Sequence, residues 1–297
     1  MMKFGNGSPR SYLASLLAAW IGCWSPCAYT ADPLPVFVSI LPQKYFVERI
    51  GGRQVQVSVM VRQGQSPETY EPTPRQMAKL AQAKLYFRIG IPFENIWLER
   101  IIAANPRMEV VDCRRGISLL PVRKGHPALE AGDQHGMADP HIWTSPPLVK
   151  IMAAHIRNAL IAAHPVSSSQ FEKNYQAFIQ DLNQLDQYIR QTLAGITHRR
   201  FMVFHPAWRY FARTYGLEEI PIERAGKEPG AKSLAALIEQ GRQEEFRAIF
   251  VQKQSSRSNA ELIARAIGAE VIVLDPLAED YGRNLRHVAT VLAKVLR

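Results

Sequence analysis

Cysteine is scarce in this chain of 297 residues, which has three, two of them near the amino terminus at Cys23 and Cys27. Only Cys113 lies further along, so we expect no internal disulfide in the mature protein, and its stability must come from a hydrophobic core. Cys113 follows the apolar run Val-Val and an aspartate, and we expect a small buried residue there, not a thiolate ligand.

Long apolar runs are also missing. Beyond the amino terminus, no stretch reaches the roughly 18 to 20 apolar residues that span a bilayer as a helix. The run at 12–22 follows Lys3 and Arg10 and precedes small residues, which is typical of a secretory signal peptide. We therefore predict a signal peptide over residues 1–31 and a periplasmic mature protein. Cys23 is a candidate for lipid attachment, but Trp20 replaces the usual leucine and we expect no anchor there.

Clusters of one charge sign are absent as well. The formal net charge is +10, two units of which the leader carries, yet the basic residues are dispersed and form no run longer than the pairs Arg114-Arg115 and Arg199-Arg200. No basic stripe is interleaved with aromatic residues. We therefore do not expect nucleic acid as a partner and interpret the charge as a solvated surface.

The rest of the sequence alternates between strand and helix patterns, which predicts α/β structure with parallel strands. In the first half, apolar β-branched runs and helical spacing alternate over 36–41, 43–50, 55–61, 74–83, 85–89, 94–104 and 108–112, before a helix over 146–163. The same alternation returns over 201–204, 207–215, 233–241, 248–251, 259–267, 271–274 and 283–296. We predict an N-terminal lobe over 32–166 and a C-terminal lobe over 198–297.

Between the lobes lies the most regular pattern in the chain. From Phe171 to Leu193, apolar residues recur at steps of three and four on one face. This predicts a helix of about 25 residues, roughly 37 Å long, which is enough to run across two lobes. The predicted fold is two (β/α) lobes joined by one long rigid helix over 167–197, with a metal site in the cleft between the lobes.

Four polar residues share one placement, just beyond a predicted strand or in the loop that follows: Glu68, His141, His205 and Asp275. Open α/β sheets bind ligands beyond the carboxyl ends of their strands. Two of the four belong to each lobe, so they can converge only between the lobes. Two imidazoles and two carboxylates suit zinc, iron or manganese. Taken singly, each residue is more often a cap or a turn residue, and spacing alone leaves both interpretations open.

Six motifs carry a resemblance that covers nearly the whole mature chain: Ser39-Ile-Leu-Pro-Gln, Gly64-Gln-Ser-Pro-Glu-Thr-Tyr-Glu-Pro-Thr-Pro, Asp139-Pro-His-Ile-Trp-Thr-Ser-Pro, Phe204-His-Pro-Ala-Trp-Arg-Tyr-Phe, Glu228-Pro-Gly-Ala-Lys and Leu274-Asp-Pro-Leu-Ala. The chain resembles the zinc/manganese-binding family of ABC-transporter solute-binding proteins. The resemblance implies one metal ion between the lobes on Glu68, His141, His205 and Asp275, and delivery to a membrane permease. We also predict a monomer.

Two departures from the family bear on which metal is bound. The resemblance implies histidine at position 68, where this chain has Glu68, and a long His-rich loop, which is reduced here to 121–139 with His126 and His135. We interpret these two as solvated loop residues; the alternative is a weak metal-capturing arm. His205 matches the zinc members, and zinc accepts a mixed nitrogen and oxygen tetrahedron. We predict Zn²⁺, with Mn²⁺ or Fe²⁺ as the alternative.

Two other classes of function compete with this interpretation. A hydrolytic metalloenzyme needs an open metal position and a general base, whereas four protein ligands close the coordination shell. The sequence has no His-Glu-x-x-His motif, nucleophile elbow or phosphate loop, and we do not expect an enzyme. The second alternative is an adhesin or a periplasmic metal buffer without a transporter, which the sequence leaves open.

Overall fold

Two four-stranded parallel sheets form the framework of the residues that the computed structural model describes, which are 1–2, 32–121, 138–223, 230–254 and 258–297. The first sheet has the order β2-β1-β3-β4, made of β1 (Leu34–Val38), β2 (Val55–Val59), β3 (Leu85–Arg88) and β4 (Glu109–Asp112). The second has the equivalent order β6-β5-β7-β8, made of β5 (Arg200–Val203), β6 (Glu218–Pro221), β7 (Ala248–Val251) and β8 (Glu270–Val273). The predicted signal peptide lies almost wholly outside the described residues.

Helices connect successive parallel strands within each lobe, because parallel strands need a crossover. In the first lobe these are α1 (Leu41–Gly51), α2 (Pro74–Leu80) and α3 (Pro92–Ala104), and α5 (Pro146–Ala163) follows the last strand. In the second they are α7 (Arg209–Tyr215), α8 (Ala231–Gln243) and α9 (Ser258–Ile267), and α10 (Tyr281–Val295) follows the last strand. Short 3₁₀ turns stand at Gly52–Gln54, Ile142–Thr144 and Pro165–Ser167. The predicted α/β fold of two lobes with parallel sheets is confirmed.

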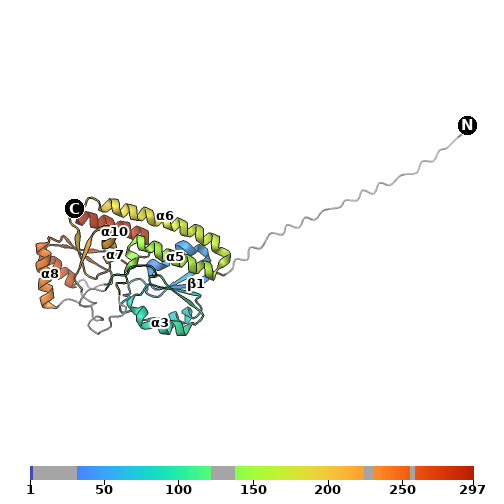
Figure 1. Cartoon of the computed structure of the whole chain (residues 1–297), viewed down its shortest axis with the longest axis horizontal. Coiled ribbons are helices and arrows are strands. Elements are labelled where there is room, and N and C mark those ends of the chain that lie inside the picture. Colours follow the sequence, from blue (N-terminus) through green and yellow to red (C-terminus); the bar gives the residue numbers. More distant parts are fainter. Residues whose placement is uncertain (3–31, 122–137, 224–229, 255–257) are drawn as a thin grey trace. The chain divides into compact units, whose positions relative to one another are not determined.

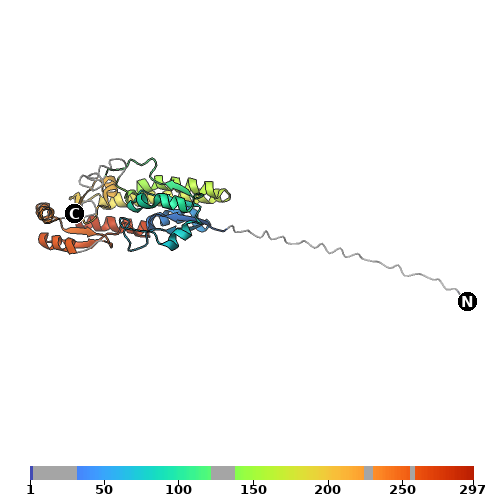
Figure 2. The ribbon, with the colours of Figure 1, turned by 90° about the horizontal axis from the view of Figure 1, so that it is seen from below.

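The long helix α6 (Ser168–Leu193) has 26 residues and packs against α1 and α5 of the first lobe and against α10 of the second. Its buried positions, which include Phe171, Phe178 and Leu185, follow the predicted spacing of three and four. Figures 1 and 2 show α6 running alongside α5 and α10 in both views. One helix therefore contributes packing surface to both lobes.

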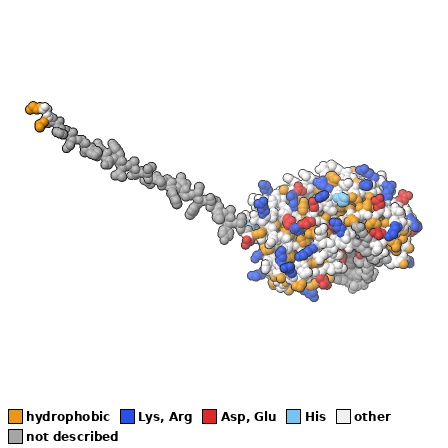
Figure 3. Space-filling view, turned by 180° about the vertical axis from the view of Figure 1, so that it is seen from behind, with side chains coloured by type: hydrophobic (Ala, Val, Ile, Leu, Met, Phe, Trp, Pro, Cys, Tyr) orange, Lys and Arg blue, Asp and Glu red, His pale blue; other side chains and the backbone are white. Residues whose placement is uncertain are grey.

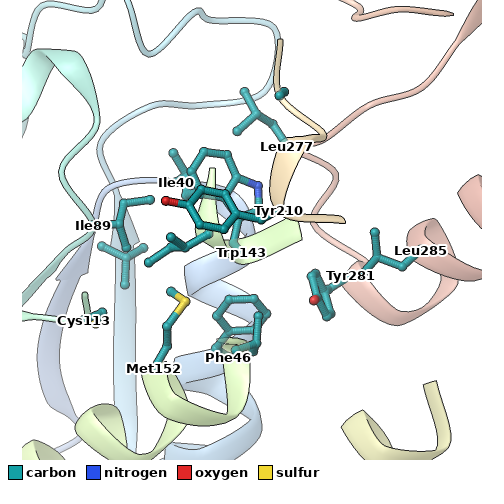
Figure 4. Close-up of a cluster of buried hydrophobic side chains, with 14 of the residues drawn as sticks. Ile40, Phe46, Ile89, Cys113, Trp143, Met152, Tyr210, Leu277, Tyr281 and Leu285 are labelled. Atoms are coloured by element: carbon teal, nitrogen blue, oxygen red, sulfur yellow. The ribbon is translucent and has the colours of Figure 1, made fainter. Parts of the chain in front are cut away.

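One hydrophobic cluster extends through both lobes, and a second, which includes Met202, Leu237 and Ile263, lies within the second lobe. The larger cluster joins the lobes. It includes Phe46 and Met152 from the first lobe and Tyr281 and Leu285 from the second, all fully or almost fully buried. Figure 4 shows these side chains in one cluster, and the rings of Phe46 and Tyr281 lie 4.9 Å apart in an edge-to-face arrangement. Cys113 belongs to the same core, and burial raises the pKa of its thiol, as expected for an inert residue.

One strand was not predicted from the sequence. β6 reads Glu-Glu-Ile-Pro, which offers neither alternation nor an apolar run. It pairs in parallel with β5, and its buried Glu219 accepts a hydrogen bond of 2.7 Å from the backbone N–H of Trp208. A tertiary contact therefore decides this strand, against its local composition.

No helix among the described residues is both long and apolar enough to cross a membrane. The face shown in Figure 3 has basic side chains scattered among acidic and apolar ones.

Candidate metal centre

Glu68 lies in the loop between β2 and α2. Gln76 holds both ends of this loop, because its Nε2 donates to the carbonyl of Met60 at 2.9 Å and its Oε1 accepts from the hydroxyl of Tyr70 at 2.7 Å. Thr73 caps α2 and accepts from the backbone N–H of Gln76 at 3.3 Å. The Ser66 hydroxyl donates to Glu68 Oε2, which leaves Oε1 for another partner.

His141 lies immediately before the 3₁₀ turn that leads into α5. Its Nδ1 is 2.8 Å from Oδ1 of Asp139, and the same oxygen accepts the backbone N–H of His141 at 3.0 Å. The carboxylate therefore fixes the orientation of the ring and keeps the proton on Nδ1, with Nε2 available as a donor atom.

His205 follows β5 and is held in the same way from the second lobe. Its Nδ1 is 2.7 Å from Oε2 of Glu223, which lies just beyond β6. Its Nε2 is buried and faces Oε1 of Glu68 at 3.2 Å. Both histidines thus have a carboxylate on Nδ1 and present Nε2, which is the usual arrangement around a metal.

Three of the four predicted ligands converge. One candidate ligand atom from each of Glu68, His141 and His205 lies within 4.8 Å of the other two, and the two imidazole rings are 5.5 Å apart. Glu68 and His141 come from the first lobe and His205 from the second, so the cluster joins the lobes. It is the one group of three or more metal-ligating side chains found among the described residues.

Asp275 follows β8 and lies outside this cluster. Its Oδ1 accepts the backbone N–H of Leu277 at 2.9 Å, and its Oδ2 is 3.6 Å from Nζ of Lys253. The next two residues, Pro276 and Leu277, nevertheless line a small cavity together with Glu68 and His141. Asp275 therefore lies at the edge of the site, paired with a lysine.

Trp143 links the turn that carries His141 to the turn that carries Asp275. Its indole N–H, two residues after His141, donates to the carbonyl of Pro276 at 2.8 Å. Both Trp143 and Trp208 are almost fully buried, as expected for residues that pack the ligand turns and exclude water.

The pKa values of His205 and Glu68 are set mainly by the opposite charges that these side chains place beside each other. Burial alone would lower the pKa of His205, but hydrogen bonds to Glu223 and Glu68, together with their charges, raise it to about 10. Burial alone would raise the pKa of Glu68, but the hydrogen bond and charge of His205, with the Ser66 contact, lower it to about 2. At neutral pH an imidazolium therefore faces a carboxylate, and a metal ion would replace the proton on His205.

Comparison with known proteins identifies the family. The sequence model of the family described as zinc-uptake complex component A, periplasmic, matches residues 36–295. The chain belongs to this family. The resemblance drawn from the six motifs is confirmed.

Several members of the zinc-uptake component A family are similar over most of the chain. A crystal structure of ZnuA is 43% identical, with a TM-score of 0.84 over 90% of this chain and 100% of that one. A ZnuA deletion mutant with zinc bound is also 43% identical, with a TM-score of 0.83 over 89% and 98% of the two chains. The high-affinity zinc uptake system protein ZnuA of Bacillus subtilis (strain 168) is 28% identical over 83% of this chain and 79% of its own.

In this member of the zinc-uptake component A family, the carboxylates of Asp139 and Glu223 behind the two histidines were not predicted from the sequence. Asp139 could have been found, because it lies two residues before His141 in the same motif. Glu223 had no local signal, because it follows the unpredicted strand β6. His126 and His135 lie outside the described residues.

Proposed function

We propose that this protein binds a single Zn²⁺ ion between its lobes and delivers it to the membrane permease of an ABC uptake transporter. The convergence of Glu68, His141 and His205 from two lobes on one point carries the proposal, since these atoms lie within 4.8 Å of one another. Family membership supports the same role, because the family is described as a component of a zinc-uptake complex.

The proposed ligands are Oε1 of Glu68, Nε2 of His141, Nε2 of His205 and Oδ2 of Asp275. Zinc bonds of about 2.0 to 2.2 Å in a tetrahedron place ligand atoms about 3.4 Å apart. Oε1 of Glu68 and Nε2 of His205 are already 3.2 Å apart, so the remaining approach falls to His141, whose ligand atom lies within 4.8 Å of both. Asp275 would need to leave Lys253. The lobes share a hydrophobic cluster, and we expect the site to close by movements of side chains.

A donor set of two nitrogens and two oxygens favours zinc. Manganese prefers more oxygen ligands and a higher coordination number, and a closed set of four provides neither. Mn²⁺ or Fe²⁺ is the alternative cargo. Elemental analysis of protein purified from its native compartment tests this, and manganese or iron at one equivalent with no zinc would overturn the zinc assignment.

We further propose that the protein is exported through a signal peptide at residues 1–31, carries no lipid on Cys23 and works as a monomer. Its lobes would be residues 32–166 and 198–297, joined by the helix over 167–197.

A closed shell of four protein ligands supports solute binding and not catalysis, because it leaves no open metal position for water. Mass spectrometry of the exported protein tests the cleavage site and any lipid on Cys23.

Metal titration of the mature protein tests the central proposal. We expect one tight equivalent of zinc, and loss of tight binding in His141→Ala and His205→Ala. The matched control is His287→Ala, which removes an exposed histidine on α10. Two or more tight equivalents in the wild type would contradict a single site. Growth of a deletion strain in zinc-depleted medium then separates uptake from a buffering or adhesive role.

A further inference from the structure

The two oxygens of Asp275 have different partners. Oδ1 accepts the backbone N–H of Leu277 at 2.9 Å, and the backbone carbonyl of Asp275 accepts from Nδ2 of Asn284 at 2.7 Å. These contacts fix the backbone and one oxygen of a residue that is 9% exposed. Oδ2 is the oxygen left for a cation.

Lys253 reaches that same oxygen from the neighbouring strand. β7 and β8 are parallel with Val251 opposite Val273, so Lys253 and Asp275, each two residues further along, leave the sheet side by side. Nζ of Lys253 lies 3.6 Å from Oδ2 of Asp275. The lysine side chain is 55% exposed, so its ammonium group can move into solvent without loss of a buried contact.

We propose that Lys253 competes with the metal for Asp275. In the metal-free protein the ammonium group neutralises Oδ2; when zinc binds, the lysine gives up this oxygen, and it takes the carboxylate back as the metal leaves. Lys253 thus lowers zinc affinity and speeds release, which suits a protein that must hand over its cargo. The proposal rests on the proposed function and on Asp275 as a ligand.

The physical basis is that one carboxylate oxygen cannot serve both cations well. A zinc ion on Oδ2 would sit about 2 Å from it, and an ammonium group held beside the same oxygen would repel the ion. Because the lysine is half exposed, solvent screens this repulsion, and we expect Lys253 to change zinc affinity only modestly. Displacement of a flexible surface lysine also requires no movement of the backbone.

The test compares Lys253→Gln with Lys253→Arg. Zinc dissociation constants come from chelator competition, and release rates from stopped-flow transfer of zinc to excess chelator. We expect Lys253→Gln to bind zinc about fivefold more tightly, as expected for loss of a half-exposed charge pair, mainly through slower release. Lys253→Arg, which keeps the charge, should stay close to wild type. Lys294→Gln removes an exposed charge from α10 and should change neither quantity.

Asp275→Asn separates this proposal from the one on which it rests. We expect Asp275→Asn to weaken zinc binding, and Lys253→Gln to have no further effect in that background. If Asp275→Asn leaves zinc affinity unchanged, the ligand set fails and competition by Lys253 fails with it. If Asp275→Asn weakens zinc but Lys253→Gln matches wild type, only the competition is overturned.

Discussion

At the scale of single residues, Glu68 is the proposed ligand at which the resemblance to the family implies a histidine. We expect Glu68→Gln to weaken zinc binding at least tenfold, because the change removes one of the two ligand charges and keeps the shape of the side chain. Glu68→His should retain zinc and bind manganese less well, since imidazole is the softer donor. Competition titrations with both metals measure this. Zinc affinity of Glu68→Gln within a few-fold of wild type would show that the carboxylate is no ligand.

A second prediction concerns the proton on His205, whose pKa is raised to about 10 by Glu223 and Glu68. Zinc must displace that proton at any pH below about 10, so affinity should rise with pH from 5 through 7 and on to 9. Calorimetry at pH 8 in buffers of different ionisation enthalpy should show about one proton released per zinc bound. Binding without proton release would be inconsistent with His205 as a ligand.

Glu223 acts on the metal only through His205. We expect Glu223→Gln to reduce zinc affinity about 10- to 100-fold, as typical for loss of a carboxylate behind a ligating histidine. It should also shrink the proton release at pH 8, because the pKa of His205 falls without this partner. Glu218→Gln, at a 60% exposed carboxylate on the same strand segment, is the matched control. A loss of affinity with unchanged proton release would point to a purely structural effect.

At the scale of elements, α6 is the helix on which both lobes pack. Phe178 is buried on α6 and contacts the rings of Tyr45 and Phe46 on α1. Phe178→Ala should therefore lower the free energy of unfolding by about 3 to 5 kcal/mol. Lys173→Ala, at an exposed position of the same helix, should change it by less than about 0.5 kcal/mol. Denaturant titration measures both, and equal effects would argue against α6 as a packing centre.

At the scale of the whole molecule, one core runs through α1, α6 and α10, so the lobes should unfold together. Calorimetry of the metal-free mature protein should show a single transition. Zinc at about 100 times its dissociation constant should stabilise the folded state by about 2.7 kcal/mol and shift the whole transition upward. Two separated transitions, of which zinc shifts only one, would contradict a site built from both lobes.

The sequence by itself determined the two-lobed fold class, the long helix and the placement of Glu68, His141, His205 and Asp275 after strands. Hydrophobic periodicity is local and parallel strands bring their carboxyl ends to one edge, so these features follow from spacing. Only the tertiary structure decided that Glu223 supports His205 and that Lys253 holds Asp275. Those contacts depend on which strands are neighbours, β6 beside β5 and β7 beside β8, and strand order is set by packing between residues distant in sequence.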